Sequence, residues 1–225
     1  MDLIYILHDD AGEEQLNIRG ETHKYLVKVR RHLIGDAISF RNPNDIKILH
    51  KYEIVDLDAR VLSLKLLESS LHKVKSKKNL HIAWCMIDAK SIEKVLPSLS
   101  EIGVEKISFI ACDRSQKNFK LDFKRFHRIL EASMQQCGRS SYIEFDIYKN
   151  IKDFIKEFPE TKVFDFCQNT LKDSNSFQTI LIGCEGGFSQ NERELLKSQE
   201  VFKLDTPMIL RSESAVMAVS SKILL

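Results

Sequence analysis

The sequence contains no uninterrupted apolar stretch that approaches the ~18 residues of a membrane-spanning helix. Its first ten residues hold an apolar run of only five and carry acidic side chains where a secretory signal has basic ones. Internal repeats and low-complexity tracts are missing as well. From these absences we expect a cytoplasmic protein that makes no contact with a membrane.

Cysteine pairs at metal-binding spacing are also missing. The five cysteines lie far apart and none forms a C-x-x-C pair. Cys85, Cys112 and Cys167 each end an apolar run, where a reduced cysteine acts as a small core hydrophobe. We therefore expect buried thiols, without a disulfide and without a bound metal.

A strong net charge is absent too, since the 34 basic and 32 acidic side chains leave only +2. With 43% hydrophobic and 29% charged residues, the composition is that of a soluble globular protein and excludes a disordered chain, a collagen or a coiled-coil rod. The charge is segregated, however: Arg19–Arg31 and Arg114–Arg139 together carry +9, so the remainder carries about −7. Two basic windows on an acidic body can bind nucleic acid.

The 225 residues fit one large domain or two unequal ones. In the first part, Tyr25, Leu26 and Val29 recur at helical spacing and predict a helix over Glu21–Arg31. Around it, short strands are expected at Leu3–Leu7, Ala37–Arg41, Ile46–Asp56 and Arg60–Leu67, the last two as a hairpin. This pattern predicts a small β-barrel with one short helix, followed by a polar, basic linker over Ser69–Asn79.

Strands and helices then alternate. Strands are expected at Leu80–Met86, Lys106–Ala111, Tyr142–Tyr148, Thr161–Phe166, Thr179–Gly183 and Val201–Leu204. Helices are expected at Ser91–Ile102, Phe123–Cys137, Ile151–Phe158, Gln190–Ser198 and from Ser212 to the end. Alternation of this kind predicts a parallel sheet with helices on both faces, so the chain is α/β (α+β overall), with domains at 1–70 and 80–225 and a linker at 71–79.

Ligands of such sheets bind beyond the carboxyl ends of the strands. The segment Thr179–Ser189 (TILIGCEGGFS) places three glycines around Glu185 after a strand, with Ser189 as a candidate N-cap. Glycines allow a close approach of backbone to ligand, although a simple strand-to-helix turn also uses them. The pattern is not G-x-G-x-x-G and lacks the Lys of a phosphate loop, which disfavours a dinucleotide or triphosphate.

A second such loop is Leu204–Ala218 (LDTPMILRSESAVMA). Ser212 is expected to be the N-cap of the final helix, and Glu213 sits where the helix dipole favours an acid. Arg211 is a cation at a helix N-terminus and therefore calls for a carboxylate, a phosphate or an anionic substrate. In a third loop, Arg114 follows a strand end and is a candidate for the same role, whereas Arg139 suits the C-terminus of its helix.

These segments together resemble the RsmE-type family of 16S rRNA uridine-N3 methyltransferases in the SPOUT superfamily, over nearly the whole chain. The most specific matches are Gly183–Glu192 (GCEGGFSQNE) and Ile209–Ala215 (ILRSESA), where the family has GPEGGFS followed by Glu, and ILRTETA. Further matches, in the family's order, are Val29–Asp36, Glu101–Val104 (EIGV), Arg114-Ser115 and Glu131–Arg139 (EASMQQCGR). The sequence departs from the family at Cys184, Thr206, Met208 and Ser98, where Pro, Gly, Arg and Lys are usual.

The resemblance implies an N-terminal PUA-like barrel that binds RNA and a C-terminal SPOUT domain with a trefoil knot. It implies S-adenosyl-L-methionine as cofactor, a homodimer, and methylation of N3 of a specific uridine, the U1498 equivalent, in the 16S rRNA of the small ribosomal subunit. The implied cofactor-binding residues are Cys167, Ile182, Gly183, Glu185, Gly186, Gly187, Leu204, Thr206, Met208, Ile209, Leu210, Arg211 and Ala215. The implied RNA-binding residues are Lys28, Arg30, Arg31, Arg114 and Arg139.

Arg211 and Glu213 are the candidate catalytic residues, with Arg211 stabilising the uracil as its anion forms. No residue is assigned as general base, because Glu185 and Glu213 could equally orient backbone or cap a helix. The alternatives are a SPOUT methyltransferase acting on another RNA position, a ribosome-associated RNA-binding protein without catalysis, and a small-molecule α/β enzyme, which would leave the basic windows unexplained.

Overall fold

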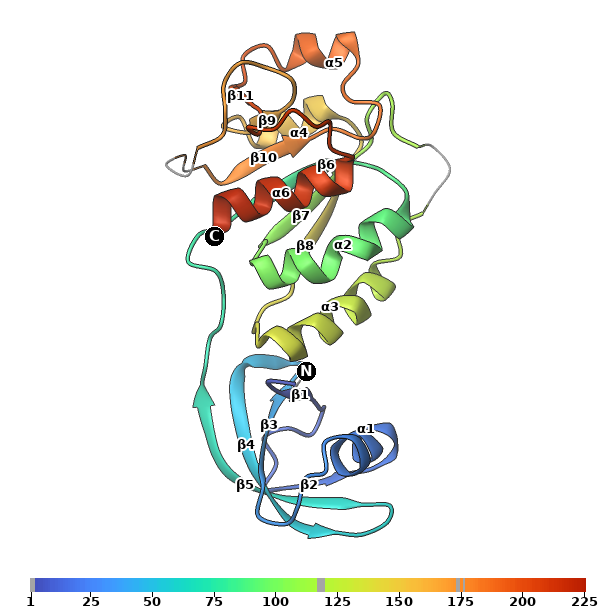
Figure 1. The fold of residues 1–225 in the computed structure, drawn as a ribbon, viewed down its shortest axis with the longest axis vertical. Coiled ribbons are helices and arrows are strands. Elements are labelled where there is room, and N and C mark those ends of the chain that lie inside the picture. Colours follow the sequence, from blue (N-terminus) through green and yellow to red (C-terminus); the bar gives the residue numbers. More distant parts are fainter. Residues whose placement is uncertain (1–2, 117–119, 173–174, 176) are drawn as a thin grey trace. The chain divides into compact units, whose positions relative to one another are not determined.

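The computed structural model describes residues 3–116, 120–172, 175 and 177–225. The chain divides into two compact units, which are described one at a time (Figure 1). Unit 1 comprises the residues up to Lys75 together with Met134–Ser141, and unit 2 comprises Ser76–Ser133 and Tyr142–Leu225.

Unit 1 is a curled five-stranded sheet with one helical segment. Its strands have the order β1-β3-β4-β5-β2, in which β1 and β3 are parallel and the other pairs antiparallel. The elements are β1 (Ile6–Leu7), β2 (Gln15–Ile18), α1 (Gly20–Lys24), the π-helix η1 (Tyr25–Val29), β3 (Ala37–Asn42), β4 (Asp45–Leu57) and β5 (Leu62–Leu71). Leu16, Phe40, Tyr52, Ile54 and Leu64 are among the buried residues of its core.

Three expectations for this part need correction. Within the described residues the sheet stays open, because β1 pairs only with β3 and β2 only with β5, so the ladder does not close into a barrel. Strand β2 was missed, since Gln15–Ile18 offers only two apolar residues in four. Residues 69–71 were assigned to the linker but extend β5, because Ile48, Leu49 and His50 on β4 supply partners for them.

Unit 2 contains a six-stranded parallel sheet, as the alternating pattern predicted. The strand order is β11-β9-β10-β6-β7-β8. The strands are β6 (His81–Cys85), β7 (Lys106–Ile110), β8 (Glu144–Tyr148), β9 (Lys162–Phe164), β10 (Thr179–Ile182) and β11 (Val201–Phe202). The helices are α2 (Ala89–Ile102), α3 (Phe123–Cys137), α4 (Ile151–Glu157), α5 (Gln190–Leu195) and α6 (Ser212–Leu224).

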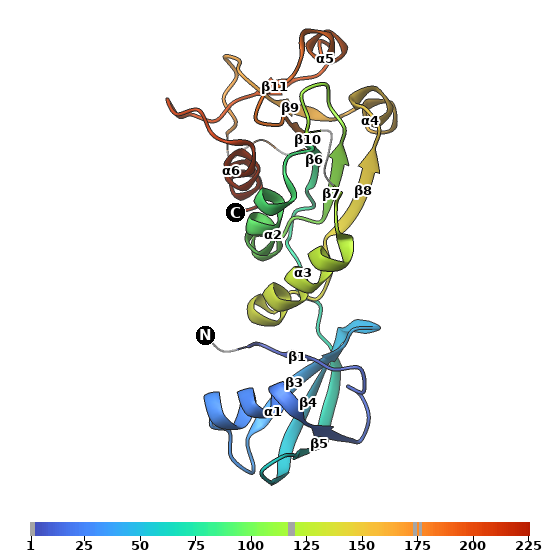
Figure 2. The ribbon, with the colours of Figure 1, turned by 90° about the vertical axis from the view of Figure 1, so that its right-hand side faces the viewer.

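Helices cover both faces of this sheet (Figure 2). Successive residues of a strand point to opposite faces, so each strand contributes side chains to the contacts on both sides. On one face, Trp84 stacks on Phe109, whose ring also contacts Phe126 of α3. Helices α2 and α6 pack against each other on that same side. On the opposite face, His81 contacts Phe154 of α4 with ring centroids 5.5 Å apart.

The expectation of five free thiols is wrong for one pair. Cys85 and Cys112 form a disulfide, although they lie 27 residues apart in the chain. The reason is the parallel pairing of β6 with β7, which brings the two strand ends together with a Cα–Cα distance of 5.8 Å. Cys137, Cys167 and Cys184 remain free thiols, and of these only Cys184 is buried.

Buried His81 gives unit 2 a pH-dependent stability. Desolvation, aided by the nearby Lys106 ammonium, lowers the pKa of His81 to about 4, and its Nε2 lies 2.7 Å from Ser108 Oγ. Between pH 4 and 6.5 the unfolded chain therefore binds the extra proton, and the free energy of unfolding decreases as the pH falls. We expect a loss of about 2 kcal/mol across this window from His81.

This loss is measured by urea denaturation at pH 7 and pH 4.5 on the native chain and on His81→Gln, whose amide replaces Nε2 without titrating. The native chain should lose more stability than the variant. An equal loss in both would show that His81 is not the group responsible.

Candidate functional site

A cavity of about 360 Å³ lies beyond the carboxyl ends of β9 and β10 in unit 2. Three chain segments form most of its wall: Phe164–Phe166 after β9, Ile182–Phe188 after β10, and residues 203–210 before α6, with Thr206 and Met208 among them. Its volume is within the range of about 300–1,000 Å³ that is usual for small-molecule sites. The parallel strands explain the location, because their carboxyl ends share one edge.

The glycines of the loop after β10 are required by its geometry. Gly187 has φ +64°, in the left-handed region, and its N–H donates to the carbonyl of Cys184 at 2.9 Å. A Cβ on Gly183 would lie 3.4 Å from the Cα of Gly187, so the turn is tight. The backbone of this loop is therefore brought directly to the cavity wall.

Helix α5 begins at this loop with a complete capping box. Ser189 accepts a hydrogen bond from Glu192 N, and Glu192 accepts one from Ser189 N, which confirms Ser189 as the N-cap. The second carboxylate oxygen of the buried Glu192 accepts from Asp113 N at 2.9 Å, and Ser189 Oγ donates to Asp113 at 2.5 Å. These bonds fix the loop after β7 to the loop after β10.

Arg114 is held in place by this connection. Its Nη1 donates to the carbonyl of Gly186 at 2.6 Å, and its side chain lines the cavity. A Cβ at position 186 would lie 3.2 Å from Arg114 Cβ, so a glycine permits the contact. The sequence suggested Arg114 as an RNA ligand; the structure places it on the wall of the same cavity as the glycine loop.

Ser212 links the beginning of α6 to the glycine loop. Its hydroxyl donates to the carbonyl of Gly183 at 2.6 Å and accepts from Trp84 Nε1 at 2.8 Å. The N-cap of α6 is Arg211, not Ser212 as expected, because the backbone of Arg211 is extended, with ψ 157°, and the helix begins at Ser212. Ser212 therefore connects β6, the loop after β10 and α6.

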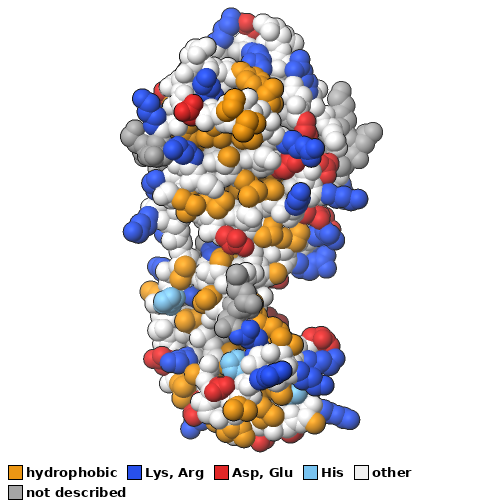
Figure 3. All heavy atoms as spheres, viewed as in Figure 1, with side chains coloured by type: hydrophobic (Ala, Val, Ile, Leu, Met, Phe, Trp, Pro, Cys, Tyr) orange, Lys and Arg blue, Asp and Glu red, His pale blue; other side chains and the backbone are white. Residues whose placement is uncertain are grey.

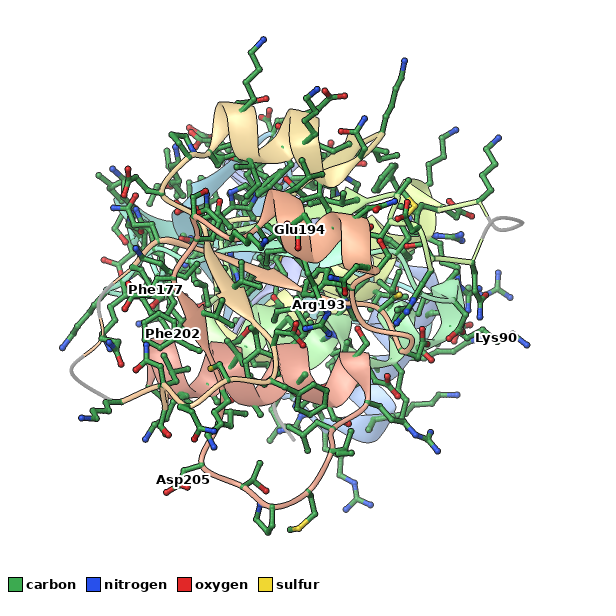
Figure 4. The ribbon with its side chains drawn as sticks, turned by 90° about the horizontal axis from the view of Figure 1, so that it is seen from above. Lys90, Phe177, Arg193, Glu194, Phe202 and Asp205 are labelled. Carbon is green, nitrogen blue, oxygen red and sulfur yellow. A yellow bond between two sulfur atoms is a disulfide. The ribbon has the colours of Figure 1, made fainter. Side chains whose placement is uncertain are left out.

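An ion pair that the sequence reasoning missed also lines the cavity. Asp165 follows β9 and accepts from the guanidinium of Arg193 on α5. Figure 4 shows Arg193 on the inner side of α5 and Asp205 on the projecting loop before α6. An acid directly after a parallel strand was an available signal for Asp165, whereas nothing local pointed to Arg193.

Eleven of the thirteen expected cofactor-binding residues line the cavity: Ile182, Gly183, Glu185, Gly186, Gly187, Leu204, Thr206, Met208, Ile209, Leu210 and Ala215. Cys167 and Arg211 do not; Cys167 Sγ lies 3.3 Å from the carbonyl oxygen of Asn169 and 3.4 Å from that of Val201. Residues that line the cavity without having been expected there are Phe164, Asp165, Phe166, Cys184, Phe188, Arg193, Lys203 and Ser212, besides Arg114.

The two candidate catalytic residues stand at the beginning of α6. Arg211 is exposed, and among the described residues its guanidinium makes no ion pair and no hydrogen bond. Glu213 is half-buried in the first turn. Neither side chain belongs to the cavity wall, so each could act only on a group that projects from the cavity.

Cys184 is a thiol and not a thiolate at neutral pH. Burial raises its pKa, and its Sγ lies 3.7 Å from the carbonyl of Gly187. A protonated, buried cysteine is a poor nucleophile. Cys184 therefore serves as a small apolar wall residue.

The expected RNA-binding residues of unit 1 fall into two groups. Lys28, Arg30 and Arg31 follow one another at the end of η1; Lys28 and Arg31 are exposed and Arg30 is half-buried. Arg139 is only 5% exposed and its Nε donates to the carbonyl of Ser141 at 2.7 Å. Its position argues for a structural role.

Neither a metal site nor a membrane-spanning helix is found in the part of the chain that the structure describes. Among those residues, no three His, Cys, Asp or Glu side chains are grouped to hold a metal ion. No described helix is long and apolar enough to cross a bilayer.

The sequence is similar to those of known proteins along most of its length. Residues 74–224 match the family model described as an RNA methyltransferase domain. Two strains of Helicobacter pylori contain a ribosomal RNA small subunit methyltransferase E that is 37% and 36% identical to this chain over 221 residues, covering 96% of it and 97% of each relative.

A solved structure shows that the similarity includes the fold. The ribosomal RNA small subunit methyltransferase E of Neisseria gonorrhoeae, bound to S-adenosyl methionine, superposes with a TM-score of 0.74 over 98% of this chain and 96% of that one. At 15% identity this shows a common fold alone. The fold and the matched sequence are thus those of the RNA methyltransferase class. Within that class, the chain belongs to the family of ribosomal RNA small subunit methyltransferase E.

The Ser212 contacts predict a measurable loss of stability. Ser212→Ala leaves Trp84 Nε1 and the carbonyl of Gly183 without the hydroxyl, and an unsatisfied buried polar group costs about 1–3 kcal/mol. Ser214→Ala, an exposed serine on the same helix, should change the free energy of unfolding by less than about 0.5 kcal/mol. Urea denaturation measures both; equal values would mean that the Ser212 hydroxyl does not hold the loop.

Proposed function

We propose that this chain transfers a methyl group from S-adenosyl-L-methionine to N3 of a specific uridine, the U1498 equivalent, in the 16S rRNA of the small ribosomal subunit. The observation that carries the proposal is the cavity, whose wall combines the glycine loop after β10 with the segment before α6. Membership of the methyltransferase E family supports the reaction and the substrate.

The cavity suits S-adenosyl-L-methionine in size and in lining. Backbone groups of Gly183–Gly187 and Leu204–Leu210 would hold the polar parts of the molecule, because the glycines leave these groups accessible. Leu204, Ile209 and Leu210 provide apolar contacts for an adenine ring. When bound, the cofactor supplies an electrophilic methyl group on its sulfonium.

The residues of the chain would position the uridine and favour its anion. Holding two reactants in attack geometry is worth about 7–11 kcal/mol in favourable cases. Arg211, which is exposed beside the cavity, would stabilise the negative charge that develops on the uracil as N3 loses its proton. Glu213, the second candidate catalytic residue, lies in the first turn of α6, and Glu185 lines the cavity. The carboxylate of either residue could accept the N3 proton.

The RNA would be bound by basic residues of both units. Lys28, Arg30 and Arg31 of unit 1 and Arg114 of unit 2 offer cations for phosphate contacts, which position an RNA while base contacts select the nucleotide. We assign RNA binding to the first part of the chain, which ends with β5 at Leu71, a linker to the residues from there to 79, and methyl transfer to 80–225. We interpret unit 1 as a PUA-like domain. With ribosomal RNA as substrate, we propose that the reaction takes place in the cytoplasm.

We further propose that unit 2 is a knotted SPOUT domain and that the chain forms a homodimer. The Ser212–Gly183 bond supports the first idea, because it shows that the chain after β11 returns to the carboxyl end of β10. Exposed apolar side chains support the second: Phe166 is 73%, Met208 67% and Ile209 81% exposed around the cavity. A partner subunit would cover such side chains.

The proposal is tested by mapping modified nucleotides in 16S rRNA from cells that lack this protein. We expect N3-methyluridine to be lost at one position and restored by the native gene. An unchanged modification pattern would contradict the substrate, and a lost modification in tRNA would favour the alternative RNA target.

Arg211→Ala separates the two roles that this residue could have. We expect the affinity for S-adenosyl-L-methionine, measured by calorimetry, to stay unchanged, and turnover on small subunits to fall about 10²–10³-fold, as for loss of one charge-stabilising donor. Lys152→Ala, an exposed cation on α4, is the matched control. Unchanged turnover would remove Arg211 from the mechanism, and lost cofactor affinity would make it a binding residue.

A further inference from the structure

Unit 1 contains a cavity of its own, of about 240 Å³, that the proposed function does not use. One side is formed by Ile4 and Ile6 around β1, another by Tyr25 of η1, and a third by the beginning of β3. Arg30 and His32 add cationic or titratable groups to this wall, and Ser39 adds a hydroxyl. The cavity thus combines an aromatic ring and aliphatic groups with polar side chains.

The backbone around the cavity is irregular in a way that brings Arg30 and His32 together. Residues two apart on a regular helix point in different directions. Here Arg30 N donates to the carbonyl of Tyr25 at 2.9 Å, a bond across five residues, and Arg31 has φ +59°. A π-turn followed by a left-handed non-glycine residue costs free energy and is found mainly where function demands it. The result is that Arg30 and His32 line the same cavity.

His32 is held in a defined orientation. Its Nδ1 lies 3.1 Å from Asp36 Oδ2, which also accepts from Leu33 N at 3.0 Å. Both contacts lower the pKa of Asp36, so the carboxylate is ionised and can only accept. Nδ1 of His32 therefore donates to Asp36, and this contact fixes the orientation of the ring at the cavity wall.

Basic side chains outnumber acidic ones in the segment that enters the cavity, where Asp36, paired with His32, is the acid of residues 25–36. From residue 25 to residue 35 the sequence contains Lys28, Arg30 and Arg31 and no acid. In the lower part of Figure 3, where α1 lies, Lys, Arg and His side chains are seen beside apolar and acidic ones. Val29, Leu33 and Ile34 are each more than 60% exposed in this segment, so apolar surface lies beside the cations.

The size of the cavity restricts its occupant. At 240 Å³ it is smaller than the ~300 Å³ at which sites for drug-sized ligands begin. A helix or a peptide strand needs an extended groove, which is longer than this cavity. An aromatic ring beside an arginine is the pairing that binds an unstacked base and its phosphate in single-stranded RNA.

We infer that this cavity takes one unpaired nucleotide of the RNA substrate, with the base against Tyr25 and the phosphate at Arg30 and Arg31. The inference rests on the proposed RNA substrate and adds a second nucleotide-binding site, in unit 1, to the methylation site in unit 2. Its role is to set which RNA segment is bound, because the pocket accepts only an unpaired nucleotide.

The test uses the full chain and a short single-stranded RNA of the target sequence that carries 2-aminopurine, a base whose fluorescence is quenched by stacking. Arg30→Met and Tyr25→Leu should each weaken binding about tenfold, which is the typical effect of losing one stacked base. Tyr25→Leu should also abolish the quenching at one position of the probe. Arg60→Met removes an equal charge from an exposed site of unit 1 outside the cavity and should change affinity far less.

A second pair of variants keeps the test decisive if a wall variant fails to fold. Ala37 lines the cavity but is exposed, so Ala37→Leu narrows the cavity without disturbing the core. It should weaken binding and reduce the quenching, whereas Val55→Leu, an exposed change on β4, should do neither. Equal affinities for Ala37→Leu and Val55→Leu would overturn the inference.

Failure of the inference and failure of the proposed function remain distinguishable. If the native chain methylates small subunits while all cavity variants bind the probe as tightly as their controls, only the nucleotide pocket is wrong. If the native chain binds neither RNA nor S-adenosyl-L-methionine, the proposed function fails and takes the inference with it.

Discussion

The hydrogen bond from Ser212 to the carbonyl of Gly183 is the contact on which the candidate site depends. It joins the beginning of α6 to the loop after β10, and Trp84 Nε1 adds β6 to the same connection. With both loops fixed, their backbones face each other across one cavity. Hydrogen bonds among Glu192, Asp113 and Ser189 likewise fix the loop after β7 to the loop after β10, and they bring Arg114 to Gly186.

These contacts explain how a site can be built largely from backbone. The glycines cost conformational freedom, and Gly187 requires a left-handed conformation that other residues adopt reluctantly. Hydrogen bonds from buried side chains compensate by holding the loop in one geometry before a ligand arrives. A preorganised loop loses little entropy on binding, which favours tight binding of a small cofactor.

Local patterns were sufficient for most of the fold. The alternation of apolar strands and amphipathic helices predicted the parallel sheet of unit 2, and Ser189, the expected N-cap, signalled the start of α5. What the sequence could not supply was contact between distant residues. The Cys85–Cys112 bond follows from strand pairing, and strand β2 is formed only because β5 offers a partner.

The candidate site was also predictable only in part from local patterns. The glycine loop and the segment before α6 were recognisable because each carries an unusual cluster of residues. Arg193 was not, since a single arginine on a short helix resembles any solvated cation until Asp165 is seen beside it. Ser212 looked like a helix cap because Trp84, its actual partner, lies 128 residues away in the chain.

The central claim, that this cavity serves methyl transfer to 16S rRNA, is tested most directly in a purified system. The chain is incubated with unmodified small ribosomal subunits and S-adenosyl-L-methionine labelled in its methyl group, and the digested RNA is analysed by mass spectrometry. The account predicts label in N3-methyluridine at one position of the 16S rRNA. Label in another nucleoside, or none in the RNA while the cofactor binds, would contradict it.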